Sequence, residues 1–369
     1  MTHTGSLPRP PDLLTLLLDA DAGRPVDAAA LEVRVRTAVR EAVQRQVDAG
    51  IDIVSDGEMG KVGFVNYLSR RLEGFGGASA AFRPADLADY PELLMERAGP
   101  RPRRPACNGP IRYRDVEAPT QDAERLVEAA RSLPVTELFI AAASPATVAQ
   151  VMGNEHYPTR RAYLYALADA LRIEYRSIIQ AGVLLQVDCP DLAMGRHVDF
   201  ADAPIADFQR AVTENVEVLN HALEGIPADR VRVHVCWGNY LGPHHRDVAL
   251  ADIVALVFTI RAGAFSIEAA NPRHAHEWTV FESVPIPDGA ILIPGVIDTK
   301  TNFIEHPDLV AERLVRLAKL VGRENVIAGT DCGFGTFATT AMVAPRVAYA
   351  KLAALAEGAR RASHALWSS

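Results

Sequence analysis

From residue 138 onward the chain repeats one hydrophobic pattern six times. Each repeat has a short apolar run rich in β-branched residues, then a polar cluster, then a longer segment with apolar residues at helical spacing. This order predicts a strand followed by a helix. The expected strands are 138–143, 184–188, 231–236, 265–269, 291–297 and 326–329. The expected helical segments are 159–181, 205–223, 248–262, a short stretch at 273–282, 307–321 and 345–361.

Two further strand-then-helix units fit at the front of the chain. Residues 4–7 precede a helical pattern at 29–49, and residues 52–55 precede a less regular region. Eight such units, with no glycine-rich dinucleotide-binding motif after the first strand, favour a closed parallel barrel over an open sheet. We therefore expect an α/β fold in which residues 1–369 form one (β/α)₈ TIM barrel.

Residues 75–120 do not fit this repeat, because they are rich in Gly, Pro and Arg and lack its hydrophobic period. They lie directly after the second expected strand. We interpret them as an inserted loop or hairpin region, placed where it could cover the mouth of the barrel.

Charge and composition narrow the possible partners. The chain has 38 Lys and Arg against 46 Asp and Glu, a net charge of −8, without a long run of like charges, so nucleic acid is a poor candidate partner. No apolar run reaches the roughly 18 residues of a membrane span. The N-terminal residues lack the apolar core of a signal peptide, and the four cysteines do not resemble a secreted disulfide framework. We expect a cytoplasmic protein that binds neither membrane nor nucleic acid.

Four polar side chains at the ends of the expected strands form a candidate metal site. His234 and Cys236 are two residues apart, so an extended strand directs both to one face. Glu268 and Cys332 follow the sixth and eighth expected strands, at the same mouth of the barrel. Two thiolates, an imidazole and a carboxylate match the preferences of zinc. The alternative for the His-x-Cys pair is ordinary packing of a buried histidine beside a small apolar cysteine.

The ligand types indicate what such a zinc site would do. Two thiolates and a carboxylate give the centre a net negative charge, which suits activation of an incoming thiol better than hydrolysis. Asn239, just beyond Cys236, is a candidate wall of the substrate pocket.

The motifs together resemble those of the cobalamin-independent methionine synthase family, over nearly the whole chain. The residues that carry the resemblance are Thr4-Gly5-Ser6-Leu7-Pro8-Arg9, Asp56-Gly57-Glu58, Asp188-x-Pro190, His234-x-Cys236, Glu268 and Asp331-Cys332-Gly333. The similarity is to the C-terminal catalytic barrel of that family, in a single-barrel form.

The resemblance implies a (β/α)₈ barrel in which zinc, held by His234, Cys236, Glu268 and Cys332, activates homocysteine for methylation. It also implies that Ser6 binds the carboxylate of the amino thiol. Glu58 and Asp188 would bind its ammonium group, since a buried ammonium requires carboxylate partners.

The chain departs from the family where the methyl donor would bind. The Asn-Trp pair expected at the third strand end is replaced by Ser144-Pro145, and the histidine expected after the seventh strand falls near Lys300 or Thr301. Folate, a corrinoid carried by a partner protein and other alkyl donors therefore remain open.

Our hypothesis is zinc-dependent transfer of a methyl or small alkyl group to a homocysteine-like thiol. Zinc-dependent addition of a thiol to an epoxide or another electrophile is the alternative within the same chemistry. A non-catalytic thiol-binding or metal-binding protein, and a zinc hydrolase, are the alternatives from other classes.

Overall fold

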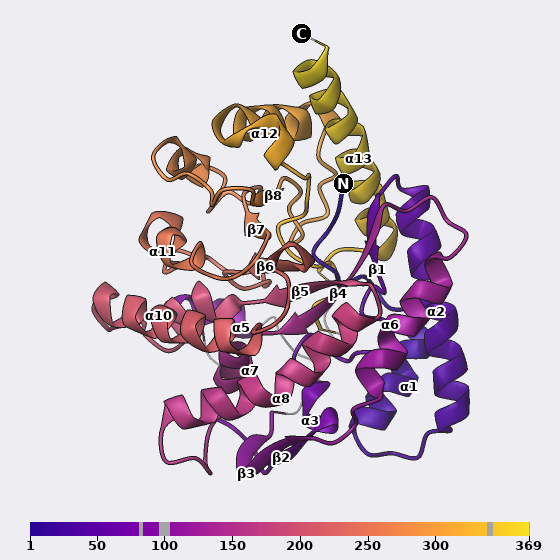
Figure 1. Ribbon diagram of the computed structural model, residues 1–369, viewed down its shortest axis with the longest axis vertical. Helices are drawn as coiled ribbons and strands as arrows, with labels where there is room; N and C mark the ends of the chain where they lie inside the picture. The colour runs from indigo at the N-terminus through magenta and orange to yellow at the C-terminus, as the bar shows by residue number, and fades with distance from the viewer. Residues whose placement is uncertain (81–83, 96–103, 338–341, 369) are drawn as a thin grey trace.

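The computed structural model describes residues 1–80, 84–95, 104–337 and 342–368. Its centre is a six-stranded parallel sheet that curls into a half-barrel, with helices packed around it (Figure 1). The strand order is β1-β4-β5-β6-β7-β8. The strands are β1 (Ile53–Ser55), β4 (Glu137–Ala143), β5 (Leu184–Asp188), β6 (Val231–Val235), β7 (Ala264–Glu268) and β8 (Ile291–Gly295).

Helices connect the strands of the sheet, and the longest pack beside one another around it, with α12 and α13 next to each other (Figure 1). The α-helices are α1 (Pro11–Asp21), α2 (Ala28–Asp48), α3 (Leu68–Arg71), α4 (Ala85–Ala88), α5 (Glu92–Met95), α6 (Ala118–Ala130), α7 (Pro145–Val151), α8 (Arg160–Gln180), α9 (Gly195–Val198), α10 (Ile205–Ala222), α11 (Leu250–Val257), α12 (Pro307–Val321) and α13 (Pro345–Trp367). The 3₁₀ helices are η1 (Pro190–Leu192), η2 (Ala228–Arg230), η3 (Glu277–Glu282) and η4 (Arg323–Asn325).

Local sequence explains where the helices begin. Thr159 caps α8 by accepting a hydrogen bond from the Ala162 amide, and Asp27 caps α2 in the same way. Within the described residues, no helix has both the length and the apolar character needed to cross a lipid bilayer.

Strand β6 illustrates how the sheet positions the functional residues. All five of its residues are buried, as expected for a parallel strand covered on both faces. The Arg232 guanidinium donates hydrogen bonds to the side chains of Gln186 on β5 and of Thr2. Because side chains alternate along a strand, His234 lies on the same face of the sheet as Arg232. The parallel register pairs His234 with Asp188, which brings these two candidate site residues to the same end of the sheet.

The last expected strand, 326–329, lies beside β8 but forms isolated bridges rather than a strand. The Ile327 amide donates to the Leu292 carbonyl at 3.0 Å, and the Gly329 amide donates to the Pro294 carbonyl at 3.1 Å. In a regular parallel pairing the amide of residue 294 would donate to the Ile327 carbonyl. Pro294 has no N–H, so this hydrogen bond is missing. The expectation of a regular strand here was wrong for this reason.

The first expected strand, 4–7, is also not a β-strand. The Thr2 amide donates to the Ala328 carbonyl at 2.9 Å. The Met1 carbonyl accepts a hydrogen bond from the amide of Ile53, the first residue of β1. The Thr4 amide instead donates to the Thr330 hydroxyl at 3.2 Å. A side chain thus takes the place of a backbone acceptor and ends the ladder. The assigned strands make a half-barrel, and the two outer segments run along its open edges as hydrogen-bonded extended chain.

Two expected helical segments need correction, and one helix was not expected. The segment 273–282 forms the 3₁₀ helix η3 in its second half rather than an α-helix, and α11 is shorter than the expected 248–262. Helix α1 was not expected at all. It begins at a proline in the first turn, a position where the missing N–H costs nothing.

The region expected to be inserted contains an antiparallel pair, β2 (Leu72–Gly76) with β3 (Ala106–Tyr113), and the short helices α4 and α5. A β-bulge lies at Gly74, where φ is +90° and a side chain would meet the backbone carbonyls of Gly109 and Pro110. Residues 81–83 and 96–103 of this region lie outside the described residues.

Candidate metal centre and active site

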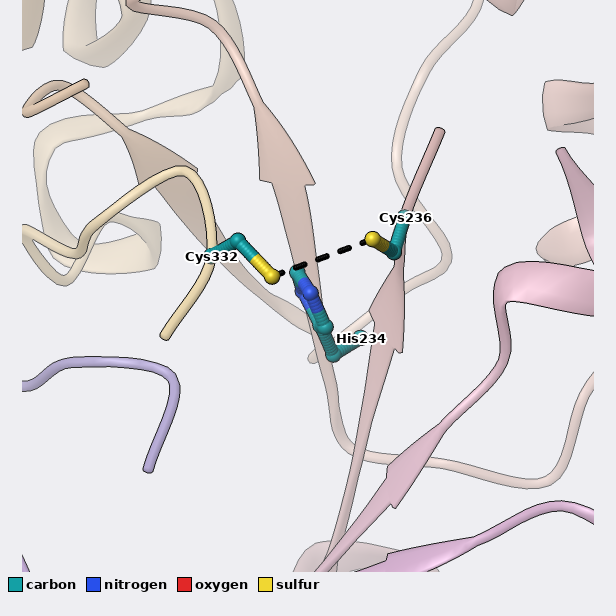
Figure 2. Close-up of side chains that lie close together, drawn as sticks. All are labelled: His234, Cys236 and Cys332. Carbon is teal, nitrogen blue, oxygen red and sulfur yellow. Dashed lines mark hydrogen bonds between the residues drawn. The ribbon is translucent and has the colours of Figure 1, made fainter. Parts of the chain in front are cut away.

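Three of the four expected metal ligands lie together. His234 is on β6, Cys236 is just beyond its end, and Cys332 follows segment 326–329 (Figure 2). One potential ligand atom from each of the three lies within 4.8 Å of the others. The sulfur atoms of Cys236 and Cys332 are 3.8 Å apart, and all three side chains are buried. His234 and Cys236 thus lie close together, in agreement with their spacing along β6, and Cys332 joins them from another segment.

The two sulfur atoms have opposite protonation preferences. A hydrogen bond from the Cys236 thiol lowers the pKa of Cys332 to about 5, with the nearby His234 acting in the same direction. The same hydrogen bond, together with burial, raises the pKa of Cys236 well above its usual value. The hydrogen bond between the two sulfur atoms therefore favours the ionised form of Cys332 over that of Cys236.

His234 has an unusual environment for a buried histidine. Neither ring nitrogen has a hydrogen-bond partner within the part of the chain that the structure describes. Burial opposes protonation of the ring, but the adjacent Cys332 and the carboxylates of Asp188 and Glu268 outweigh it and raise the pKa of His234. A buried imidazole without hydrogen bonds next to two sulfur atoms fits a metal ligand, since an unpartnered buried polar group is otherwise costly.

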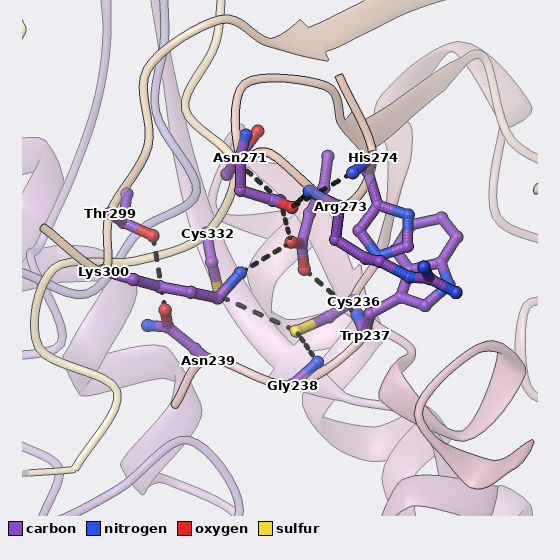
Figure 3. A network of polar contacts seen from close by, with 12 residues as sticks. Cys236, Trp237, Gly238, Asn239, Asn271, Arg273, His274, Thr299, Lys300 and Cys332 are labelled. Carbon is purple, nitrogen blue, oxygen red and sulfur yellow. Dashed lines mark hydrogen bonds and ion pairs between the residues drawn. The ribbon is translucent and has the colours of Figure 1, made fainter. Parts of the chain in front are cut away.

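Glu268, the fourth expected ligand, lies at the end of β7 but outside this cluster of three. Its Oε1 accepts a hydrogen bond from the Trp237 amide at 3.0 Å. Its Oε2 accepts from the Asn271 side-chain amide at 2.8 Å and from the Lys300 ammonium at 2.9 Å (Figure 3). Burial would raise the pKa of Glu268, but the charge of Lys300 outweighs it and lowers that pKa. The carboxylate is thus ionised and held beside the cysteines.

Asp331 joins the segments that carry two of the expected ligands. It directly precedes Cys332, and its carboxylate accepts hydrogen bonds of 2.8 Å from the backbone amides of Ala269, Ala270 and Asn271. Those three residues directly follow Glu268 in the sequence. Burial, followed by the negative charge of Glu268, raises the pKa of Asp331 to about 7. The position of Cys332 is therefore tied to that of the loop after β7.

Glu58 is a buried carboxylate in a strained backbone conformation. Its φ of 55° is positive, which is uncommon for any residue but glycine and is often found at functional sites. Burial raises the pKa of Glu58 to about 7. Its Oε2 has no hydrogen-bond partner among the described residues, and the nearest cation is Arg9, 3.8 Å away.

Arg9 holds the segment that carries Glu58. Its Nε donates to the Glu58 carbonyl at 3.1 Å, and its Nη1 donates to the Gly335 carbonyl at 2.6 Å. The guanidinium thus connects Glu58 to the chain that follows Cys332. Arg9 lies in the N-terminal motif, but we assigned it no role from the sequence.

Asp188 and Ser6 lie next to the same cluster. Asp188 accepts a hydrogen bond from Gln186 at 2.7 Å, and burial raises its pKa to about 6. The carbonyl of Ser6 accepts a hydrogen bond from the Phe334 amide at 2.8 Å. The Ser6 hydroxyl packs so closely on Gly333, the residue after Cys332, that any side chain at Gly333 would collide with it. Asp188 is thus paired with His234 across the sheet, and Ser6 lies against the residue that follows Cys332.

Asn239 connects loops with its side chain. Its amide nitrogen donates to the Gly333 carbonyl and to the Thr336 hydroxyl, both at 2.7 Å. Its amide oxygen accepts from the Thr299 hydroxyl at 3.3 Å. These contacts place Asn239 at the rim of the site and engage both of its polar groups, while its expected role in substrate binding remains a prediction.

A second polar cluster lies beside the loop after β6. Asp86 on α4 accepts hydrogen bonds from the Tyr240 hydroxyl at 2.6 Å and the His244 amide at 3.0 Å. Asp247 accepts from rings of His244 and His274 at 2.9 and 3.0 Å. Asp86 and His274 lie far from the 240–247 loop in the sequence, so only the fold reveals that they meet it.

Comparison with known proteins identifies the family of this chain. The family model described as "Cobalamin-independent synthase, Catalytic domain" matches residues 1–355. The chain is 25% identical to a methionine synthase of Saccharolobus solfataricus, over 97% of this chain and 93% of the relative. It is 26% identical to a methionine synthase of Thermococcus kodakarensis, over 96% and 90%.

Solved structures show the same fold. A B12-independent methionine synthase from Shewanella, in complex with selenomethionine, superposes with a TM-score of 0.75 at 22% identity and covers 100% of this chain and 99% of its own. A vitamin-B12-independent methionine synthase described as putative, from Listeria monocytogenes, gives 0.66 at 18% identity, with 99% and 96% covered. On the extent of the family match, this chain belongs to the cobalamin-independent synthase family, as its catalytic domain.

Proposed function

We propose that this protein transfers a methyl group to the sulfur of an amino thiol, with homocysteine as the acceptor, and that zinc is its cofactor. The observation that carries the proposal is the buried cluster of His234, Cys236 and Cys332 at one end of the sheet. The methionine synthases to which the chain is similar, and its family membership, support the same reaction.

The donor set fits zinc. Two sulfur atoms and an imidazole nitrogen lie within reach of one ion, and soft sulfur ligands with an imidazole select zinc among common divalent metals. We propose His234, Cys236 and Cys332 as ligands, with Glu268 as the fourth. When bound, zinc supplies the positive charge that lets a thiol lose its proton near neutral pH.

The residues around the cluster would bind the amino-acid part of the acceptor. Glu58 and Asp188 are buried carboxylates, and a substrate ammonium group would give the unpartnered oxygen of Glu58 a charged hydrogen bond. We assign the Ser6 hydroxyl to the substrate carboxylate. The arrangement would hold the amino acid by its charged end while its sulfur points to the metal.

We also propose the closed form of the fold. The two open edges of the half-barrel are hydrogen-bonded to segments 1–5 and 326–330, and these segments are hydrogen-bonded to each other. This supports a closed (β/α)₈ barrel in which two irregular extended segments take the place of strands. In this view residues 1–369 form one catalytic domain, and residues 75–120 are an insertion after its second strand, β1.

The methyl donor is the part of the reaction that needs experiment. At the end of β4, where the family resemblance implies a tryptophan, Ser144 uses its hydroxyl to bind Asp191 and Thr147. This favours no donor class, and the family's description as cobalamin-independent lends no support to a corrinoid protein partner.

The test is an assay of the zinc-loaded protein with homocysteine and, in parallel, a methylated folate, methylcobalamin or a small epoxide. The expected result is formation of methionine with one methyl donor, at a rate that depends on added zinc. If a thioether forms from the epoxide and no methyl donor reacts, methyl transfer is wrong and thiol addition is the function. Tight homocysteine binding without turnover of any donor would replace it by a binding function.

A further inference from the structure

The ammonium group of Lys300 forms an ion pair with Glu268, the carboxylate that we propose as the fourth metal ligand. Its Nζ lies 2.9 Å from Oε2 of Glu268, and both side chains are buried. Lys300 comes from the loop after β8, 32 residues from Glu268 in the sequence. In Figure 3 its side chain extends from beside Thr299 and Asn239 toward Cys236.

Glu268 is fully satisfied without a metal ion. Lys300 and the Asn271 amide share Oε2, and the Trp237 amide binds Oε1. A carboxylate with these partners gains less from a metal than a free one, because it must give up a buried ion pair first. Only the other three ligands are ready to bind without such an exchange.

We propose that Lys300 is a positioning residue that competes with the metal ion for Glu268. In this arrangement His234, Cys236 and Cys332 hold the metal, and Lys300 decides how firmly Glu268 joins them. A carboxylate that can return to Lys300 leaves the fourth position open for the substrate thiol. The inference rests on the zinc site of the proposed function and deepens it.

Charge supports this role. A divalent ion with two thiolates and one carboxylate has a formal charge of −1, which one lysine balances. Without the metal, the same lysine forms an ion pair with Glu268 in a site that also contains Asp331 and Cys332. A nearby fixed cation therefore compensates the site in both states, and it weakens the affinity for a second cation.

The loop that carries Lys300 does not depend on its ammonium group. The Lys300 amide donates to Oδ1 of Asp298 at 3.0 Å, and the Thr301 hydroxyl donates to Oδ2 of the same residue at 2.6 Å. The Asp298 amide in turn donates to Glu305 at 2.9 Å. A substitution that removes only the charge of Lys300 should therefore leave the loop in place.

The test is the zinc affinity of the purified chain, measured by competition with a chromophoric chelator at fixed pH. We expect Lys300→Met to bind zinc about tenfold more tightly than the wild type, a change typical of groups that contact metal ligands. Lys300→Arg, which keeps the charge, should bind close to the wild type. Damage to the fold would weaken binding, so a gain in affinity separates competition from a purely structural role.

A second pair of variants tests whether the effect passes through Glu268. In a Glu268→Gln background, Lys300→Met should tighten zinc binding by much less, because the contested carboxylate is gone. Lys319→Met removes the charge of an exposed lysine on α12 and should not tighten binding.

The outcomes separate this inference from the function on which it rests. If the wild type binds zinc through Cys332 and Lys300→Met binds it equally or more weakly, competition by Lys300 is wrong and the zinc site stands. If the gain persists undiminished in Glu268→Gln, Lys300 acts on the metal by charge alone, and the competition is again wrong. If the wild type binds no zinc, both proposals fail.

Discussion

The sulfur atoms of Cys236 and Cys332 lie 3.8 Å apart although 96 residues separate them in the chain. One follows β6 and the other follows the irregular segment beside β8, so the curvature of the sheet brings them together. A disulfide framework does not explain the pair, since all four cysteines are free. The metal site that we propose would account for this pair together with the unpartnered ring of His234.

Replacing one sulfur should remove the metal. Cys332→Ser is expected to lose most of its zinc and to lower methyl transfer more than about a hundredfold, because a hydroxyl at this site is not ionised near neutral pH. Elemental analysis of the purified variant measures the zinc. Cys107→Ser, at a buried cysteine on β3, is the matched control and should keep its metal. Full zinc retention in Cys332→Ser would remove this site as the metal centre.

Ionisation of the buried Glu58 carboxylate should lower the stability of the folded protein at high pH. Because the folded state raises the pKa of Glu58 from 4.5 to about 7, its contribution to stability is fully present below about pH 4.5 and is lost as pH rises through about 7. Glu58→Gln cannot ionise, so its free energy of unfolding should exceed that of the wild type by up to about 3 kcal/mol at pH 8.

Denaturant unfolding of both proteins between pH 5 and pH 8 measures this difference. The advantage of the variant should shrink toward the acid end of the range. At pH 8 the same variant should bind homocysteine more weakly, since a neutral amide replaces the partner of the ammonium group. A variant that is more stable and still binds the acceptor normally would contradict the role assigned to Glu58.

The loop after β7 should depend on Asp331. In Asp331→Asn the remaining Oδ1 can still accept the amides of Ala269 and Ala270, but an NH₂ group replaces Oδ2 and cannot accept the Asn271 amide. We expect a loss of about 2–3 kcal/mol in the free energy of unfolding and a 10- to 100-fold loss in zinc affinity. Asp308→Asn, at an exposed ion pair on α12, should change neither by a comparable amount.

The contact between Ser6 and Gly333 should tolerate no extra atoms. A methyl group at Gly333 would overlap the Ser6 hydroxyl, so Gly333→Ala must displace Ser6 or the Cys332 loop, at a cost of about 1–3 kcal/mol. Titration with homocysteine should show weaker binding. In Gly153→Ala the new methyl group would be 3.5 Å from its nearest neighbour, so affinity should be unchanged there. Equal behaviour of the two variants would argue against a binding role for Ser6.

The hydrophobic period predicted much of the architecture, because strands and helices that bury one face must repeat at fixed spacing. Six of the eight expected strands and most of the long helices are confirmed, with small differences at their ends. The period could not show that Pro294 interrupts pairing beside β8 or that the Thr330 hydroxyl interrupts pairing between the two outer segments. Those interruptions depend on which atoms face each other across strands.

The chemistry of the site divides in the same way. Local pattern was enough to place His234 and Cys236 on one face, because a strand repeats every two residues, and the motifs indicated the family that the match over residues 1–355 then established. The three-dimensional contacts were needed to show that Glu268 is paired with Lys300, that Asp331 holds the neighbouring loop, and that Glu58 has a positive φ with an unpartnered oxygen. Ion pairs and backbone strain of this kind arise where distant segments meet, and local sequence pattern contains no information about that meeting.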